Sequence, residues 1–237
     1  MLSQPVEGQE RGAPILTTEF EAVTDSGGPG KWRGGVGARK ASILREGENT
    51  VLSYICDRER AVVWGTNGGL PSMPHGLHVR HAGANEDTWL GSVFSDVPLQ
   101  SGDLFSRPTA GGGGYGDPLE RDPEKVKADV VDDYVSIERA ARDYDVILKV
   151  IDKDLCAYEV DGEATKRERA AIRARRRGWL EEEPETVAAK YRAGEIDALD
   201  AVRRYAVILD WGSGDLMPRS TEQFRDQFRI RSLGHWG

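Results

Sequence analysis

The sequence predicts an α+β fold, with a β-rich, glycine-punctuated first half and a mainly helical second half. Glycine is concentrated in positions 8–116, whereas the chain after Asp117 is rich in Glu, Arg, Ala and Asp. Because glycine costs conformational entropy inside helices and serves turns and bulges, the first region favours strands and loops. We therefore expect a β-rich segment over residues 1–116 and a helical segment with a C-terminal tail over residues 117–237.

The first segment contains short apolar runs separated by turn residues, a rhythm that predicts an antiparallel meander. Residues 47–49 separate one pair of runs, and the polar residues 57–60 separate the next pair. The strands expected from this pattern cover residues 14–23, 36–44, 50–56, 61–64, 89–94 and 97–99.

The second segment carries helix start and stop signals. Asp122-Pro123 places a cap residue before a proline at the first helical position, and Ser136 is a second cap. Gly178 is expected to stop the helix that Asp161 caps, and Ser220 with Gln223 predicts a capping box for a last helix ending near residue 232. The expected helices start at 123 and 136 and cover 162–177, 184–193, 197–204 and 220–232, with strands at 144–148 and 205–209.

The second segment contains one pair of similar stretches. Residues 141–148, ARDYDVIL, resemble residues 202–209, VRRYAVIL. In both, the end of a helix is expected to lead into a buried strand. Because solenoids need about three units, a single pair is not a repeat array, and we interpret it as two similar helix–strand junctions.

Charge and cysteine content exclude several classes of protein. A net charge of −8 argues against general affinity for nucleic acid or anionic membranes, which attract basic surfaces. The sequence contains no apolar run of the ~20 residues that a membrane span needs, and residues 1–7 lack the pattern of a secretory signal. Two cysteines, Cys56 and Cys156, exclude a disulfide framework, and free thiols favour a cytoplasmic location.

Two glycine-rich motifs carry a family resemblance. The first covers residues 25–37, DSGGPGKWRGGVG, and the second covers residues 111–123, GGGGYGDPLERDP. Val160-Asp161, Ala164-Thr165 and Arg167 add a third segment in the same order. Together these segments resemble hydantoinase B, the class of subunits shared by N-methylhydantoinases, oxoprolinases, acetone carboxylase and acetophenone carboxylase. The resemblance covers roughly residues 14–177, and the tail, 180–237, resembles extensions of carboxylase-type members.

The sequence departs from the family pattern at several turns. Asp133 and Asp145 stand where the family usually has glycine, and Ala110 stands where it usually has proline. The stretch 71–81 also does not follow the usual pattern.

The resemblance implies an ATP-dependent complex that phosphorylates its substrate and then carboxylates an enol or opens a cyclic amide. It implies ATP and a divalent metal for the whole complex, with neither bound by this chain alone. The implied partners are a hydantoinase B-like N-terminal subunit and a hydantoinase A-like subunit. Because family subunits are longer and carry their metal-ligand residues upstream of the first motif, we expect a split subunit or a fragment, inactive alone.

Three functions are compatible with this resemblance. The first is the C-terminal piece of a split subunit in a biotin-independent carboxylase, of which acetophenone carboxylase is the nearest type, mainly completing the fold and the assembly. The second is the same piece of an N-methylhydantoinase or oxoprolinase. The third is a non-catalytic scaffold module derived from this fold.

The two glycine runs hold the residues expected to face a ligand or an interface. The second run lacks the Gly-Lys-Ser or Gly-Lys-Thr of a P-loop, and Asp117 and Glu120 would repel phosphate, so we favour a close backbone crossing there. In the first run, Lys31 and Arg33 can grip a carboxylate or phosphate, or the loop can brace a neighbouring subunit. The candidate residues are Ser26, Gly27, Gly28, Lys31, Arg33, Gly113, Gly114 and Tyr115.

Other groups of reactive or charged residues favour no site. His75, His78 and His81 are spaced by three, but nearby prolines prevent a helix, and in an extended chain His78 points opposite the others. We therefore expect no metal site among them. The arginine-rich stretch 166–177 also carries glutamates, which is typical of a solvated or subunit-facing helix, and Cys56 is expected to be a small core residue.

Apolar residues near both ends predict a surface that a partner covers. Exposed sheet edges and uncovered apolar faces are liabilities that another chain commonly hides. The residues expected on this surface are Ile15, Leu16, Phe20 and Trp32 near the start, and Phe224, Phe228, Ile230, Leu233 and Trp236 in the tail.

Overall fold

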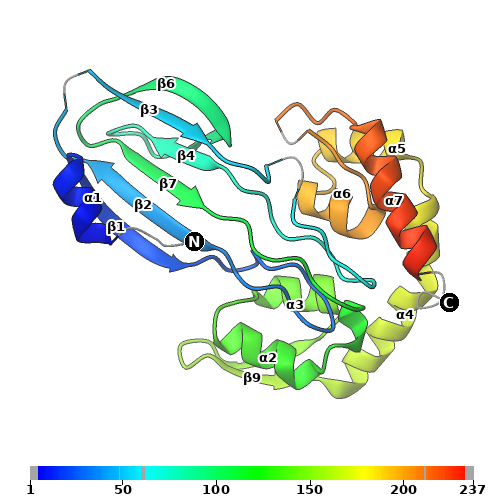
Figure 1. The fold of residues 1–237 in the computed structure, drawn as a ribbon. Helices are drawn as coiled ribbons and strands as arrows, with labels where there is room; N and C mark the ends of the chain where they lie inside the picture. Colours follow the sequence, from blue (N-terminus) through cyan, green and yellow to red (C-terminus); the bar gives the residue numbers. More distant parts are fainter. Residues whose placement is uncertain (1–4, 48, 60–61, 211, 233–237) are drawn as a thin grey trace. The chain divides into compact units, whose positions relative to one another are not determined.

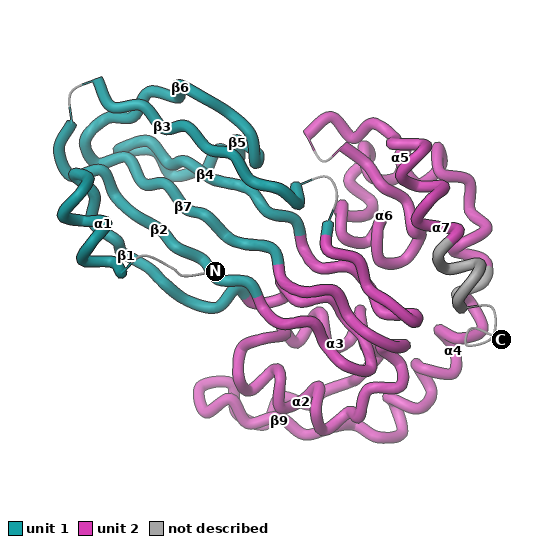
Figure 2. Tube along the Cα trace, viewed as in Figure 1, with its two compact units in different colours: residues 1–23, 37–62, 74–110 teal, residues 24–36, 63–73, 111–237 magenta. Residues whose placement is uncertain are grey.

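A computed structural model describes residues 5–47, 49–59, 62–210 and 212–232, and the side chains of 176, 177 and 227–232 are not described. The chain forms two compact units (Figure 2). Unit 1 comprises residues 1–23, 37–62 and 74–110, and unit 2 comprises residues 24–36, 63–73 and 111–237. The loops 24–36 and 63–73 therefore belong with the helical second half.

Unit 1 is built from antiparallel strands (Figure 1). One sheet has the strand order β1 (Ile15–Ala22), β2 (Ala38–Leu44), β7 (Leu104–Pro108), β4 (Leu77–Arg80), β5 (Thr88–Gly91). A second, two-stranded sheet pairs β3 (Thr50–Ile55) with β6 (Val93–Leu99). The helix α1 (Val6–Gly12) precedes β1, and its Glu10 accepts a hydrogen bond from the backbone N–H of Thr17.

The core of unit 1 joins the two sheets. Leu44, Leu77 and Val79 of the larger sheet are buried with Leu99 of β6. Partly buried side chains from β3 and β6 pack against them, including Tyr54 and Phe94. Apolar side chains on alternate positions of facing strands thus bury one face of each sheet, as period-two alternation dictates.

The predicted meander is wrong, although the predicted antiparallel pairing is correct. After β2 the chain passes into the second sheet, and β2 pairs instead with β7. The strands β4 (LHVR) and β7 (LFSRP) were not predicted, because polar residues interrupt their short apolar runs. The expected strand 89–94 is split after Gly91, whose φ of +80° ends β5, and residues 62–64 form no strand.

Unit 2 contains most of the helices, which confirms the predicted α+β class. The side chains of Asp122, Ser136 and Asp161 accept hydrogen bonds from first-turn N–H groups, as predicted for caps. Its elements are η1 (Pro118–Glu120), α2 (Pro123–Val131), α3 (Ile137–Tyr144), β8 (Leu148–Asp152), β9 (Ala157–Val160), α4 (Gly162–Glu181), α5 (Pro184–Arg192), α6 (Ala198–Tyr205) and α7 (Pro218–Ser232).

Three local predictions in unit 2 are wrong. The helix α4 continues through Gly178 to Glu181, since one glycine inside a long helix costs only about 1 kcal/mol. The helix α7 begins at Pro218, which places Ser220 inside its first turn. The expected strand 144–148 begins only at Leu148, after the left-handed C-cap Asp145. The expected strand 205–209 is reduced to a single bridge between Leu209 and Leu216, after the left-handed C-cap Ala206.

The internal similarity covers more residues in the structure than in the sequence. Residues 122–148 and 183–209 share a helix with proline at its start, a left-handed turn residue, a second capped helix and a left-handed C-cap. The turn residues are Asp133 and Gly194, and the C-caps are Asp145 and Ala206. Asp133 and Asp145 thus adopt the positive φ that glycine would adopt at the two positions where the family usually has it.

The hydrogen bonds of the two similar segments, 122–148 and 183–209, also correspond. In each, the residue after the C-cap donates to an alanine carbonyl in the preceding helix, at 3.0 and 2.9 Å. The next N–H donates to a threonine hydroxyl in the following helix, from Ile147 to Thr165 at 3.0 Å and from Ile208 to Thr221 at 2.9 Å. The two segments therefore correspond as whole helix–turn–helix segments and not only at their helix–strand junctions.

Part of the tail is core. Phe224 is 2% exposed and packs against Leu70 and Trp64, with ring centroids 4.6 Å apart in the aromatic pair. The prediction that Phe224 faces a partner is therefore wrong. The side chains of Phe228 and Ile230, and residues Leu233 and Trp236, lie outside the described part of the chain. Among the described residues, no helix is both long and apolar enough to cross a membrane.

Candidate functional site

The two glycine runs cross each other in unit 2. The N–H of Gly28 donates to the carbonyl of Gly112 at 2.8 Å, and the N–H of Gly112 donates to the carbonyl of Gly35 at 2.8 Å. Trp32 and Tyr115 exchange two backbone hydrogen bonds of 2.9 Å in an antiparallel bridge. Residues far apart in the sequence therefore form one small unit of paired backbone.

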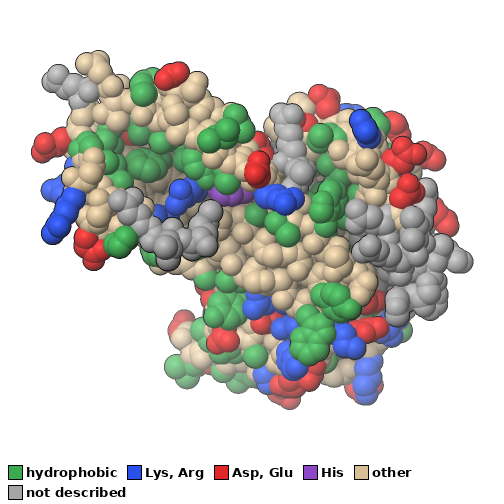
Figure 3. Space-filling model, in the orientation of Figure 1, with side chains coloured by type: hydrophobic (Ala, Val, Ile, Leu, Met, Phe, Trp, Pro, Cys, Tyr) green, Lys and Arg blue, Asp and Glu red, His purple; other side chains and the backbone are tan. Residues whose placement is uncertain are grey.

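A third loop, residues 63–73, completes the crossing. Leu70 donates to the carbonyl of Pro29 at 2.7 Å and accepts from the N–H of Gly114 at 3.0 Å. Thr66 donates to the carbonyl of Gly114 at 2.9 Å. Figure 3 shows that the surface over these loops is largely backbone and uncharged polar side chains, coloured tan. We call this arrangement of residues 26–35, 63–70 and 111–116 the glycine crossing.

Glycine is required at the glycine crossing because the backbones nearly touch. A Cβ atom would lie 1.7 Å from the Trp64 carbonyl oxygen at Gly113, and 1.9 Å from the Pro29 carbonyl oxygen at Gly114. At Gly28 it would lie 2.2 Å from the Leu70 carbonyl oxygen. Such distances exclude any side chain, so the second run is the close backbone crossing that we favour over a phosphate loop.

Arg33 reaches protein groups of unit 2. Its Nε lies 3.2 Å from Asp129, its Nη1 donates to the carbonyl of Gly34 at 2.7 Å, and its guanidinium lies over the ring of Tyr134. Asp129 is also bound by Arg121 at 2.7 Å. A carboxylate of the same chain, that of Asp129, therefore pairs with Arg33.

The other candidate residues have different environments. Ser26 is fully buried, and its carbonyl accepts from the N–H of Met73 at 3.0 Å. Lys31 is exposed and lies 3.2 Å from Glu120, whereas Tyr115 is half exposed beside Trp32. Lys125 lies over the ring of Trp32. The exposed side chains of the crossing thus include a pair of aromatic residues flanked by lysines.

Arg203 was not singled out from the sequence, yet it ties the glycine crossing to the helices. Its side chain is 1% exposed and binds Asp143 at 2.7 Å. Its guanidinium also donates to the carbonyl oxygens of Pro71 and Gly27, at 3.2 and 3.4 Å. Burial lowers the pKa of Arg203, and the facing Asp143 opposes this shift. Only its burial distinguishes it from the neighbouring Arg204, so the sequence carried no signal for it.

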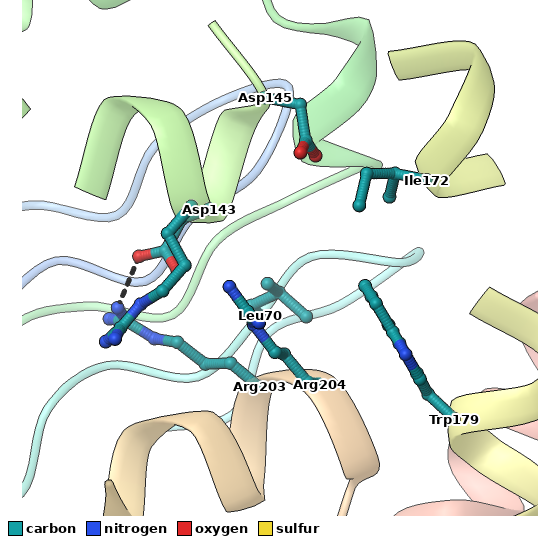
Figure 4. A pocket seen from close by; sticks show the side chains of 8 residues that line it. Leu70, Asp143, Asp145, Ile172, Trp179, Arg203 and Arg204 are labelled. Atoms are coloured by element: carbon teal, nitrogen blue, oxygen red, sulfur yellow. Dashed lines mark hydrogen bonds and ion pairs between the residues drawn. The ribbon is translucent and has the colours of Figure 1, made fainter. Parts of the chain in front are cut away.

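A small cavity lies beside Arg203 (Figure 4). Trp179 and Ile172 of α4 line it together with Leu70, Asp145 and the arginines of α6. Its volume of about 30 Å³ suits one or two water molecules, since one water needs a cavity of roughly 10–15 Å³. The cavity is therefore too small for an organic substrate.

Comparison with known proteins decides the family. A family model described as hydantoinase B/oxoprolinase matches residues 1–118. This chain belongs to the hydantoinase B/oxoprolinase family. The match contains residues 26–35, 63–70 and 111–116, so the whole glycine crossing lies within the family region.

Relatives of this hydantoinase B/oxoprolinase chain fall into two groups. The putative B subunit of a D-/L-hydantoinase from Pseudomonas sp. is 33% identical over 69% of the chain, and the beta subunit of the caprolactamase from Pseudomonas jessenii is 34% identical over 62%. The acetone carboxylase alpha subunit of Xanthobacter autotrophicus is 26% identical over 91%. The chain spans 27%, 26% and 31% of these relatives, respectively.

Two solved structures have a similar fold. A nucleotide-free acetone carboxylase matches with a TM-score of 0.63 at 19% identity, and the match covers 98% of this chain and 33% of the other. The ATP-dependent caprolactamase of Pseudomonas jessenii matches with a TM-score of 0.60 at 28% identity, and the match covers 71% of this chain and 28% of the other. The fold of unit 1 and unit 2 therefore recurs in larger chains.

The three histidines that the structure describes have separate partners in unit 1. His75 contacts Tyr54 and Cys56, His78 contacts the ring of Trp89, and His81 lies 2.9 Å from Asp103. In the sequence, Cys56 and His75 showed no relation to each other. A strand and a loop bring them together, and neither carries a motif that would have signalled the pair.

Proposed function

We propose that this chain is part of a hydantoinase B-type subunit in an ATP-dependent, biotin-independent carboxylase such as acetophenone carboxylase. The supporting observation is the extent of the sequence matches. Similarity to the acetone carboxylase alpha subunit covers 91% of the chain, and similarity to the acetophenone carboxylase delta subunit of Aromatoleum aromaticum, at 27% identity, covers 78%. The hydantoinase and caprolactamase matches cover 69% and 62%.

The competing function is part of an ATP-dependent N-methylhydantoinase, oxoprolinase or related cyclic-amide hydrolase. Higher identity favours it, at 33% and 34% for the hydantoinase and caprolactamase subunits against 26% and 27% for the carboxylase subunits. A scaffold module without a catalytic complex is the third candidate. The share of the chain covered by the matches favours the carboxylase, whereas sequence identity favours the hydrolase. A measurement of activity is therefore needed to separate the two functions.

The role we propose for the chain itself is to complete the fold and support assembly. The arginines at and beside the glycine crossing have ion-pair partners within the chain, because Arg33 binds Asp129 and Arg203 binds Asp143. Among the described residues, no group of three or more His, Cys, Asp or Glu side chains could hold a metal ion. We propose that ATP and the divalent metal bind elsewhere in a cytoplasmic complex.

The proposed partners are the remaining portion of a hydantoinase B-type subunit and a hydantoinase A-like subunit. The chain spans 26–31% of the relatives described above, which leaves most of such a subunit to be supplied. The exposed pair of Trp32 and Tyr115 suits an interface, because aromatic residues are enriched at interface centres.

The test is substrate-dependent ATP hydrolysis by the complex purified through a tag on this chain. We expect phosphate release to require a ketone, acetone or acetophenone, together with bicarbonate. Omitting bicarbonate is the matched control, and the chain alone is expected to be inactive. Phosphate release with hydantoin, 5-oxoproline or caprolactam, and none with ketones, would establish the competing function instead.

A further inference from the structure

The polar cluster in unit 1 joins a thiol, an imidazole and a phenol. Cys56 Sγ lies 3.1 Å from Nδ1 of His75, and the hydroxyl of Tyr54 lies 2.6 Å from Nε2 of the same ring. His75 is buried, whereas Cys56 is partly exposed. Each ring nitrogen of His75 therefore has its own polar partner, and both partner residues, Cys56 and Tyr54, are partly exposed.

Backbone contacts fix the two reactive groups. The N–H of Cys56, just after β3, donates to the carbonyl of Ser92 at 2.8 Å, and the N–H of His75 donates to the carbonyl of Arg58 at 2.9 Å. The Tyr54 ring packs against Phe94 across the β3–β6 pair. The thiol and imidazole are thus held together by strands and loop on both sides, which is the geometry that an activated nucleophile needs.

The electrostatics of the cluster keep the imidazole in its neutral form, in which one ring nitrogen can accept a proton, and the lowered pKa makes it a weaker base than a free imidazole. Burial, and then the positive charge of Arg107, lower the pKa of His75, so the ring is neutral at neutral pH. Burial, and then the neighbouring Cys56, raise the pKa of the Tyr54 phenol, with Arg107 opposing, so the phenol stays protonated. Arg107 also has a buried Nε without a hydrogen-bond partner among the described groups. Its charge would stabilise negative charge that develops beside His75.

We propose that Cys56 is a nucleophilic thiol that His75 activates, and that it reacts with small compounds that carry an electrophilic carbon. In the reaction with such a compound, the bond from Sγ to carbon forms as the bond from carbon to the leaving group breaks. The leaving group departs with its electron pair, and the thiol proton passes to Nδ1 of His75. Tyr54, on the other nitrogen, positions the ring.

Cys156 provides an internal control. It lies in the turn between β8 and β9, is exposed, and has no imidazole partner among the described contacts. If accessibility alone governed the reaction, Cys156 would react faster than the partly exposed Cys56. General-base assistance contributes roughly 10²–10⁴-fold to proton transfers, which is more than partial burial is expected to cancel.

The test is alkylation of the folded full chain by iodoacetamide, followed for each cysteine by peptide mass spectrometry. At pH 7 we expect Cys56 to react at least about tenfold faster than Cys156. A Cys56 rate equal to or below the Cys156 rate in the unmodified protein would overturn the proposal.

Variants then assign the role of the imidazole. His75→Gln is expected to lower the Cys56 rate at least about tenfold, while the Cys156 rate stays unchanged. Tyr54→Phe, which keeps the ring packed, is expected to lower it less. His81→Gln, at an exposed histidine with a different partner, is the control and should change neither rate. An unchanged Cys56 rate in folded His75→Gln would overturn the proposal. If His75→Gln does not fold, an unchanged Cys56 rate in folded Tyr54→Phe would overturn it instead.

Discussion

At the scale of single residues, Arg33 and Arg173 allow a direct comparison. Arg33 joins Asp129 in an ion pair in which both side chains are at most 15% exposed, whereas Arg173 is exposed on α4. Removing one partner of a buried pair costs about 3–5 kcal/mol, and Asp129 keeps Arg121. We therefore expect Arg33→Ala to lower the free energy of unfolding by about 2–3 kcal/mol, measured by urea denaturation.

Arg173→Ala is the matched control and should change stability by less than about 0.5 kcal/mol. The same order is expected for the yield of assembled complex. Equal losses of stability for the two variants would contradict the assignment of Arg33 to a buried pair.

Arg203 supports a second prediction. Arg203→Met removes the charge that faces Asp143 and the donors to Pro71 and Gly27, while its side chain can still fill the site. We expect a loss of about 2–4 kcal/mol, because the buried carboxylate of Asp143 loses this partner and keeps only Arg139, at 3.6 Å. Arg204→Met, at a partly exposed neighbour, should lose less than about 1 kcal/mol in the same thermal or urea unfolding assay. Similar losses for both would refute the role given to Arg203.

The sequence indicated Arg33 but not Arg203. Arg33 stands inside a glycine run, where close backbones imply a nearby partner, although Asp129 could not be chosen because it lies far along the chain. Arg203 stands beside another arginine in a helix, and only tertiary burial separates the two. The contact between Cys56 and His75 was missed for the same reason.

At the scale of elements, the glycine crossing predicts opposite outcomes for two glycines. At Gly113 a Cβ atom would lie 1.7 Å from the Trp64 carbonyl oxygen, whereas at Gly35 nothing lies within 4 Å. Gly113→Ala should therefore lower stability by at least about 2 kcal/mol, since overpacking commonly costs about 1–3 kcal/mol. Gly35→Ala should leave stability within about 1 kcal/mol of the parent. Thermal unfolding, followed by circular dichroism, measures the stability of both variants. A Gly113→Ala variant as stable as the parent would show that the loops do not approach closely.

Local signals predicted elements better than they predicted pairing. Caps at Asp122, Ser136 and Asp161 act within one helical turn, so the sequence alone located these helices. The pairing of β2 with β7 joins distant residues and depends on which faces are buried. Strand order in unit 1 was therefore not predictable from the spacing of apolar runs.

At the scale of the whole molecule, apolar side chains remain exposed where a partner is expected. Leu16 and Phe20 lie on β1, the edge strand of the larger sheet in unit 1, and are 43% and 62% exposed. Trp32 is 56% exposed at the glycine crossing. Exposed edges and aromatic side chains favour association with another chain. This expectation concerns each unit separately and does not involve Phe224, which is core.

Size-exclusion chromatography with light scattering tests the central claim that this chain works as part of a larger hydantoinase B-type assembly. Co-expressed with a hydantoinase B-like N-terminal partner and a hydantoinase A-like partner, the chain should elute as one stable complex of defined mass. Expressed alone, it should self-associate or aggregate, and Phe20→Ser with Trp32→Ser should reduce that self-association. A stable monomer that binds neither partner would contradict the account.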